Sequence, residues 1–197
     1  MSDSETIDVY NRRAAEYAGL TDRDNRADPQ LLAFLARLPK GGRVLDLGCG
    51  PGASAATLAG AGMRVDPTDA SVEMVALAAR NPGVTARQAS FDDITGDQVY
   101  DGIWANFSLL HAPRDRMPDH LAALHRALKP GGVFHIGMKL GEGSQRDSIG
   151  RLYTYYTEAE LAGLLSDAGF TVTDRAHGRD LGLDGVYADW ICLSAHG

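Results

Sequence analysis

Short apolar runs and longer amphipathic stretches alternate along the chain after residue 40. A short apolar run bounded by turn residues predicts a buried strand, and apolar positions recurring every three or four residues predict a helix. The strands predicted in this way cover 43–47, 63–67, 84–88, 100–106 and 132–138, and the helices cover 53–61, 71–80, 115–128 and 157–168. This alternation is typical of a parallel sheet with helices on both faces.

The two ends of the chain depart from that alternation. Residues 170–174 and 187–193 have the pattern of strands, but the link between them is rich in glycine and charge and has no helical pattern. Without a crossover helix, the two strands are predicted to form an antiparallel hairpin. Ahead of the sheet, 4–18 and 28–38 are predicted to be helices, the second capped by Asp28 and started by Pro29.

The first predicted strand ends in Asp46 and runs into Gly48-Cys49-Gly50-Pro51-Gly52. Alternate glycines let a backbone turn sharply and approach a ligand, and a helix that follows presents free N–H groups there. Ala53 occupies the last position of the dinucleotide fingerprint, so the glycine spacing alone does not choose a ligand. The carboxylate of Asp46 would repel a pyrophosphate and attract a cation, such as the amino group of S-adenosylmethionine.

A second acid, Asp69, ends the second predicted strand about 20 residues after the glycines, where an acid meets ribose hydroxyls. Together these residues resemble the class I S-adenosylmethionine-dependent methyltransferases, whose glycine loop has the form hh-D-h-G-C-G-x-G. Further segments that resemble landmarks of this family are Tyr100–Ala105, Ser108–His111, Leu128–Val133 and Ala168–Phe170. The chain resembles in particular small bacterial members that act on small molecules, a group that includes tellurite-resistance-type proteins.

The resemblance implies a three-layer, Rossmann-like α/β fold, with a mostly parallel seven-stranded sheet and an antiparallel terminal hairpin. It also implies one methyltransferase domain over 1–197, in which 1–39 cover the cofactor site and 40–197 form the core. The residues expected to bind S-adenosylmethionine, or its product S-adenosylhomocysteine, are Tyr10, Tyr17, Asp46, Gly48, Cys49, Gly50, Gly52, Asp69, Ala70, Met74, Ser90, Phe91 and Asn106. Many relatives carry an acid in place of Ser90, so the adenine contact falls to Ser90, to Asp92 or to backbone carbonyls.

The reactive edge is expected at Asn106-Phe107-Ser108-Leu109-Leu110-His111. Relatives that methylate nucleobases or amides often carry an Asn/Asp-Pro-Pro-aromatic tetrad there, and the absence of both prolines disfavours such acceptors. His111 is the candidate catalytic residue, as general base for a hydroxyl or ammonium acceptor. The alternative is that His111 packs against the turn before Pro113.

The segment 139–151 follows the fifth predicted strand and contains enough glycine and charge to act as a lid. Its cations, Lys139, Arg146 and Arg151, are candidates to grip an anionic substrate, or else they pair with Glu142 and Asp147 in a solvated loop. Tyr153 and Tyr156 line the acceptor pocket or pack internally. The acceptor atom, whether oxygen, nitrogen, sulfur or a metalloid, stays open.

Composition narrows the remaining classes. With 197 residues, 44% hydrophobic content and a formal net charge of −7, the chain suits one domain with a small-molecule substrate and disfavours nucleic-acid binding. Two cysteines without metal-ligand spacing indicate a reduced, cytoplasmic protein without a metal, and no apolar run is long enough for a membrane span. We expect a monomer or homodimer.

Two other functions compete with methyl transfer. An NAD(P)-dependent oxidoreductase would use a similar glycine loop, but Asp46 and the terminal hairpin count against it. A non-catalytic S-adenosylmethionine-binding protein would keep the pocket and show no turnover.

Overall fold

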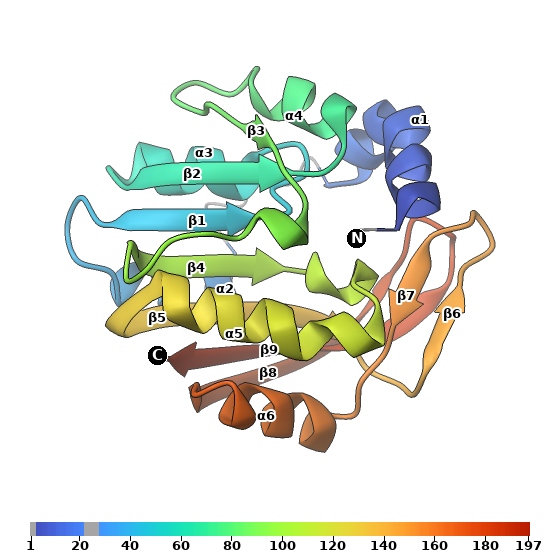
Figure 1. Cartoon of the computed structure of the whole chain (residues 1–197). Helices are drawn as coiled ribbons and strands as arrows, with labels where there is room; N and C mark the ends of the chain where they lie inside the picture. The colour runs from blue at the N-terminus through green and yellow to red at the C-terminus, as the bar shows by residue number, and fades with distance from the viewer. Residues whose placement is uncertain (1–2, 22–27) are drawn as a thin grey trace.

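The structure is a computed structural model that describes residues 3–21 and 28–197. Its centre is a seven-stranded sheet in the order β3-β2-β1-β4-β5-β9-β8 (Figure 1). The strands of this sheet are β1 (Arg43–Leu47), β2 (Arg64–Asp69), β3 (Arg87–Gln88), β4 (Tyr100–Asn106), β5 (Leu128–Lys139), β8 (Thr171–Leu181) and β9 (Tyr187–His196). The first five strands pair in parallel, whereas β9 is antiparallel to both β5 and β8. The α/β class, the mostly parallel sheet and the antiparallel hairpin predicted from the sequence are confirmed.

Helices cover both faces of this sheet. The helices are α1 (Ser4–Thr21), α2 (Pro29–Ala36), α3 (Ala53–Gly60), α4 (Val72–Ala78), α5 (Met117–Ala127) and α6 (Glu158–Asp167), with short 3-10 turns η2 (Phe91–Asp93), η3 (Leu109–His111) and η4 (Arg114–Arg116). In Figure 1, α5 and α6 lie in front of the sheet and α2 and α3 lie behind it. The first face holds the larger core cluster, and the second holds the cluster around α2.

Successive residues of each buried strand serve opposite cores. On β4, for example, Ile103 packs with α5 and α6, while Trp104 packs with Leu31 and Phe34 of α2. Because side chains alternate across a strand, a strand covered on both faces needs apolar residues at every position. This explains the continuous apolar runs of the sequence.

Several boundaries differ from the predictions. Strand β3 has two residues instead of five. Strand β8 continues to Leu181, and β9 begins at Tyr187 as predicted, so most of the predicted link between them belongs to β8. Asp180 pairs with Ala188 in that extension. The backbone pairing of two antiparallel strands tolerates polar residues at an edge. The glycine-rich and charged residues of the predicted link therefore form an exposed part of the β8–β9 hairpin and not a loop.

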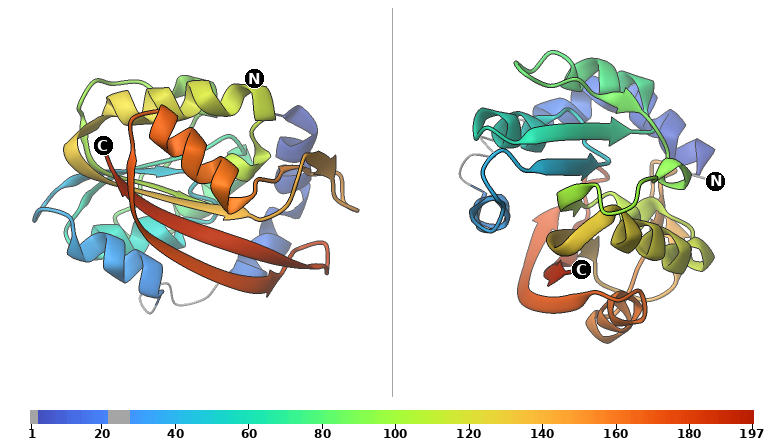
Figure 2. Two further views of the ribbon diagram at one scale, coloured as in Figure 1. Left: turned by 90° about the horizontal axis from the view of Figure 1, so that it is seen from below. Right: turned by 60° about the vertical axis from the view of Figure 1, so that its left-hand side comes forward.

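A second, two-stranded sheet closes the edge at which the parallel strands end. It consists of β6 (Ser144–Arg146) and β7 (Leu152–Thr154). Part of the predicted lid segment is therefore strand β6. The β6–β7 hairpin lies beside α1 at the carboxyl ends of β1, β2 and β4, as the views in Figures 1 and 2 show. A hydrogen bond joins the two, because Leu152 N–H of β7 donates to Thr6 Oγ1 of α1 at 2.8 Å. Within the described residues, no helix has the length and apolarity that crossing a bilayer requires.

Candidate functional site

The glycine loop between β1 and α3 needs glycine for two reasons. Gly48, Gly50 and Gly52 all have left-handed φ angles, of 71°, 52° and 86°, which side chains disfavour. A Cβ on Gly48 would also stand 2.3 Å from Cβ of Ser108, and one on Gly52 would stand 2.9 Å from Ala78. Backbone conformation at all three positions, and space at Gly48 and Gly52, therefore select glycine, and Gly48 and Gly50 line the cleft described below.

Asp69 fastens this loop to β2. Its Oδ2 accepts from Gly50 N–H at 2.9 Å, and its Oδ1 accepts from Ser71 N–H at the same distance. Burial nevertheless raises the pKa of Asp69 above its usual value. The carboxyl group lines the cavity described below, as an acid at the end of the second strand should if it meets a ribose.

Asp46 is almost completely buried, with 2% of its surface exposed. It accepts a backbone hydrogen bond from Ala55, but its Oδ2 has no partner among the described residues. Burial, and then the charge of Asp69, raise the pKa of Asp46 to about 7. A buried carboxylate oxygen without a donor is costly, so this position suits a cationic ligand.

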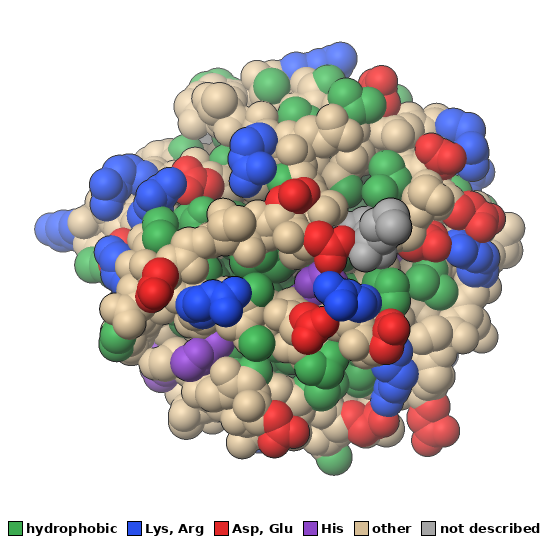
Figure 3. Space-filling view, in the orientation of Figure 1, with side chains coloured by type: hydrophobic (Ala, Val, Ile, Leu, Met, Phe, Trp, Pro, Cys, Tyr) green, Lys and Arg blue, Asp and Glu red, His purple; other side chains and the backbone are tan. Residues whose placement is uncertain are grey.

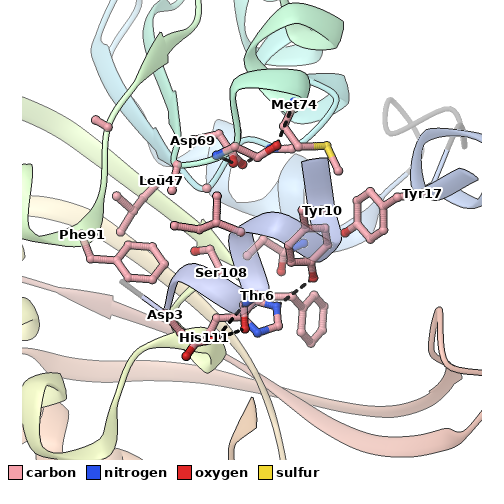
Figure 4. A pocket seen from close by; sticks show the side chains of 18 residues that line it. Asp3, Thr6, Tyr10, Tyr17, Leu47, Asp69, Met74, Phe91, Ser108 and His111 are labelled. Atoms are coloured by element: carbon pink, nitrogen blue, oxygen red, sulfur yellow. Dashed lines mark hydrogen bonds between the residues drawn. The ribbon is translucent and has the colours of Figure 1, made fainter. Parts of the chain in front are cut away.

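A cleft of about 720 Å³, including its opening to solvent, lies above the ends of β1, β2 and β4 (Figure 4). The described residues that line it are Asp3, Thr6, Ile7, Tyr10, Tyr17, Leu47, Gly48, Gly50, Asp69, Ala70, Ser71, Met74, Ala89, Phe91, Asn106, Phe107, Ser108 and His111. On the face in Figure 3, acidic and basic side chains are interspersed and neither sign forms a broad patch.

The structure brings most of the predicted cofactor residues to this cleft. Four predicted residues do not belong to its lining. Asp46 is buried on β1, and Gly52, the last glycine of the loop, precedes α3. Cys49 is buried in a small cluster with Ala55 and Ala78. Ser90 caps η2, where its N–H and hydroxyl both donate to Asp93 Oδ2 at 2.8 and 2.9 Å. Phe91, the neighbour of Ser90, does face the cleft.

His111 and Tyr10 meet at the opposite end of the cleft from Asp69 (Figure 4). Tyr10 Oη lies 2.8 Å from His111 Nε2, and His111 Nδ1 lies 2.6 Å from the carbonyl oxygen of Leu152. Burial is the main reason that the pKa of His111 falls to about 4, and nearby Arg151 and Lys139 lower it further. The ring is therefore neutral at pH 7, and both of its nitrogens are hydrogen-bonded.

The predicted substrate residues lie behind or beside this pair. Arg151 is 2% exposed and forms an ion pair with Asp147 at 2.8 Å, while its Nη1 donates to Tyr10 Oη at 3.1 Å. Tyr153 and Tyr156 are buried in the main core cluster. Arg146 is partly exposed and binds both carboxylate oxygens of Asp3, at 2.8 and 2.9 Å. None of these four predicted substrate residues lines the cleft among the described residues; their role in substrate binding stays a prediction.

Sequence reasoning assigned no role to several residues of the site, although Ser108 lay within the expected reactive edge. Asp3 and Thr6 reach the cleft from the start of α1, and Ser108 lies under the glycine loop with its Oγ buried and without a partner among the described residues. His135, fully buried on β5 and stacked on Trp104 at 3.8 Å, donates from Nε2 to Asn106 Oδ1 at 3.1 Å. No local signal reveals these contacts, because each joins elements that are distant in the sequence.

Comparisons with known proteins agree with this geometry. Residues 44–132 match the family model described as a methyltransferase domain. The chain is 35% identical over 129 residues to the malonyl-[acyl-carrier protein] O-methyltransferase of Enterobacter lignolyticus, covering 64% of this chain and 49% of that protein. It is 39% identical over 132 residues to a trans-aconitate 2-methyltransferase of Variovorax paradoxus, covering 63% and 48%. The chain thus spans about half the length of the curated relatives it matches.

Among solved structures, the fold is similar to that of 1,6-didemethyltoxoflavin-N1-methyltransferase from Burkholderia thailandensis, crystallised with 1,6-didemethyltoxoflavin and S-adenosylhomocysteine. The TM-score is 0.76 at 25% identity, and the match covers 98% of this chain and 87% of that one. The chain is thus similar to methyltransferases in sequence over 44–132 and in fold over nearly its whole length.

Proposed function

We propose that this protein transfers the methyl group of S-adenosylmethionine to a small-molecule acceptor. One observation carries the proposal: the buried Asp46 has a carboxylate oxygen without a partner among the described residues, and it precedes the glycine loop that, with the second acid Asp69, lines one end of a single cleft. Two carboxyl groups on which no described cation acts suit a positively charged nucleoside and would repel a diphosphate. Nothing in the structure or the comparisons favours the oxidoreductase or the non-catalytic alternative.

The residues present fit this cofactor. Asp46 would hold the amino group, Asp69 the ribose hydroxyls and the glycine loop the backbone of the amino-acid portion. Met74 and Phe91 would border the adenine, and Tyr10 or Tyr17 would reach the carboxylate end. Apart from Asp46, which is buried at the end of β1, these residues all line one cleft, and that supports their roles.

The bound cofactor supplies a methyl group already activated by a sulfonium leaving group. The work left to the protein is to align the acceptor with that methyl group and to keep water away. Helix α1 and the β6–β7 hairpin do so by closing the reactive edge of the cleft.

A small acceptor agrees with the named substrates of two relatives, trans-aconitate and 1,6-didemethyltoxoflavin. The proposal includes a single domain over 1–197, in which 1–39 cover the cofactor and 40–197 form the core. It also includes a cytoplasmic monomer or homodimer, and the narrower likeness to tellurite-resistance-type proteins stays a prediction within it.

Calorimetric titration of the purified protein with S-adenosylhomocysteine and with NADH tests the proposal. We expect micromolar binding of S-adenosylhomocysteine only, lost in Asp69→Asn. Asp66→Asn is the matched control, because Asp66 lies on the same strand but pairs with Arg43 at 2.8 Å, away from the cleft. Binding of NADH in preference to S-adenosylhomocysteine would contradict the proposal.

A further inference from the structure

We define the acceptor end of the cleft by Asp3, Tyr10, Asn106, Ser108 and His111. At this end the proton-accepting groups are engaged in hydrogen bonds, whereas some groups that can donate are not. If the protein is the methyltransferase proposed above, this set restricts the chemistry of the acceptor. A hydroxyl or ammonium acceptor must lose a proton and needs a free base. An acceptor that is already anionic needs donors instead.

The lone pair of His111 is already occupied. A carbonyl oxygen can only accept, so the contact to Leu152 places the ring proton of His111 on Nδ1. Nε2 then carries only a lone pair, which accepts the hydroxyl proton of Tyr10. Tyr10 Oη in turn accepts from Arg151 Nη1, so the three side chains form a satisfied chain without a free base.

The charges around His111 oppose its protonation. The groups that act on it are the cations Arg151 and Lys139 and the carboxylate Asp147, which Arg151 already pairs. An imidazolium at this position would face a net positive charge. The pKa of about 4 agrees with that arrangement.

Asp3, the carboxylate at this end of the cleft, is equally committed. It accepts two bonds from Arg146, and further bonds from Thr6 N–H at 2.9 Å and Thr6 Oγ1 at 2.6 Å. These donors hold the pKa of Asp3 well below its usual range, and a carboxylate so stabilised is a poor proton acceptor.

The uncommitted groups are donors. His135 occupies Asn106 Oδ1, which leaves the Asn106 amide nitrogen. Ser108 Oγ has no partner among the described residues. Lys139 does not line the cleft among the described residues; its Nζ, half-buried at the end of β5, lies 4.1 Å from the centre of the Tyr153 ring, whose centre lies 4.7 Å from that of the His111 ring. Its ammonium makes no ion pair with a described carboxylate; Asp147 and Asp184 act on it only from a distance.

We propose that the methyl acceptor is a carboxylate, bound in its ionised form by Asn106 and Ser108 with Lys139 contributing positive charge from behind Tyr153, and that His111 serves as a neutral structural partner of Tyr10. A carboxylate oxygen attacks the methyl carbon, the carbon–sulfur bond breaks with its electron pair on sulfur, and a methyl ester and S-adenosylhomocysteine form. No proton moves. The negative acceptor and the positive sulfonium neutralise one another, a reaction that a water-poor cleft favours.

The state of His111 can be measured without any acceptor. In ¹⁵N NMR spectra assigned with His111→Gln, we expect the neutral Nδ1–H form between about pH 5.5 and 8. A His111 ring that titrates near its ordinary pKa would be a usable base, and that result would overturn the proposal.

The substrate class is tested with matched probes. Benzoate, cinnamate and fumarate, each beside its primary amide and the corresponding alcohol, are offered with S-adenosylmethionine while S-adenosylhomocysteine and the methylated product are quantified. With S-adenosylmethionine saturating at every pH, so that titration of Asp46 does not limit cofactor binding, we expect turnover of carboxylates only, at a rate that does not rise with pH between about 6 and 8. Preferred methylation of an alcohol or amide, or no carboxylate better than its amide, overturns the proposal.

Lys139 supplies the second arm of this test. Lys139→Met should raise KM for the best carboxylate by about tenfold or more, and Lys139→Arg should restore part of the loss. Lys40→Met, an exposed lysine at the opposite edge of the sheet, is the matched control and should leave KM unchanged. Equal KM values for Lys139→Met and wild type also overturn the proposal. Failure to bind S-adenosylhomocysteine is a separate outcome, which contradicts the proposed function itself.

Discussion

The backbone of Phe107 is the strained position of the reactive edge. Its φ angle is 54°, in the left-handed region that bulky side chains avoid, and it follows β4 directly. Its N–H donates to Gly137 O at 3.0 Å, and its ring lies edge-on to Trp190 at 6.0 Å while lining the cleft. The surrounding contacts therefore hold the ring at the place where an acceptor would lie.

This strain predicts an inverted order of stability for two substitutions. Phe107→Val should be less stable than Phe107→Asn by about 1 to 2 kcal/mol, although valine is the more hydrophobic, because asparagine tolerates a left-handed backbone and a β-branched residue does not. Urea unfolding at pH 7.5 measures the difference. A more stable valine variant would show that the backbone conformation carries no such cost.

At the scale of elements, α1 and the β6–β7 hairpin close the site through two ion pairs of different kind. Arg151 and Asp147 are buried within the hairpin segment, with 2% and 4% of their side chains exposed. Arg146 and Asp3 join the hairpin to α1 near the surface, where the Arg146 side chain is 39% exposed. Burial decides how much each pair contributes, because water screens the second pair and not the first.

We expect Asp147→Ala to lower the free energy of unfolding by about 3 to 5 kcal/mol, since it leaves a buried guanidinium uncompensated. Arg146→Ala, which also removes one charge from the same hairpin, should cost less than about 1 kcal/mol. Denaturant unfolding of both variants makes the comparison. Equal losses would mean that the partly exposed ion pair between Arg146 and Asp3 is as important for stability as the buried pair.

At the scale of the whole molecule, the sheet order reverses direction between β1 and β4, and the cleft opens at that switch point. The cofactor end is built by β1 and β2, and the acceptor end by α1, the end of β4 and the residues that follow β4. Asp46 connects this site to the stability of the molecule, because its pKa rises from 3.8 to about 7 on folding. A carboxyl group with a raised folded-state pKa takes up protons on folding, so its contribution to stability falls as the pH rises from 4 to 7.

The difference between Asp46→Asn and wild type should therefore depend on pH. Asparagine resembles the protonated carboxyl, so the variant without cofactor should match wild type near pH 4 and be more stable by about 2 to 4 kcal/mol near pH 8. S-adenosylhomocysteine should cancel this advantage, because its ammonium stabilises only the ionised carboxylate. Thermal unfolding across this pH range, with and without S-adenosylhomocysteine, measures both effects.

A pH-independent difference would mean that Asp46 is ionised at little cost in the free protein. Asp101→Asn serves as the control, because Asp101 pairs with Lys129 at 2.7 Å and its pKa is lowered rather than raised. That variant should be less stable than wild type near pH 8, the opposite sign to Asp46→Asn.

The sequence alone determined the class of the fold and the cofactor end of the cleft. Both follow from short-range rules: apolar runs mark strands buried on both faces, and Gly48, Gly50 and Asp69 form one local unit in which Gly50 N–H binds the Asp69 carboxylate. Because such patterns lie within a few residues or at a fixed spacing, they can be recognised from a single amino-acid sequence.

Only the tertiary structure decided which groups at the acceptor end are free. From the sequence, His111 was a candidate base and Arg151 a candidate to bind an anion. In the structure, Tyr10, 101 residues before His111, donates to the lone pair of His111, and Arg151 is engaged by Asp147 and Tyr10. Ser90 is likewise committed to Asp93, and Asn106 Oδ1 to His135. The hydrogen-bond partners of a side chain are set by the groups that folding brings next to it, and the spacing of residues along the chain does not identify those partners.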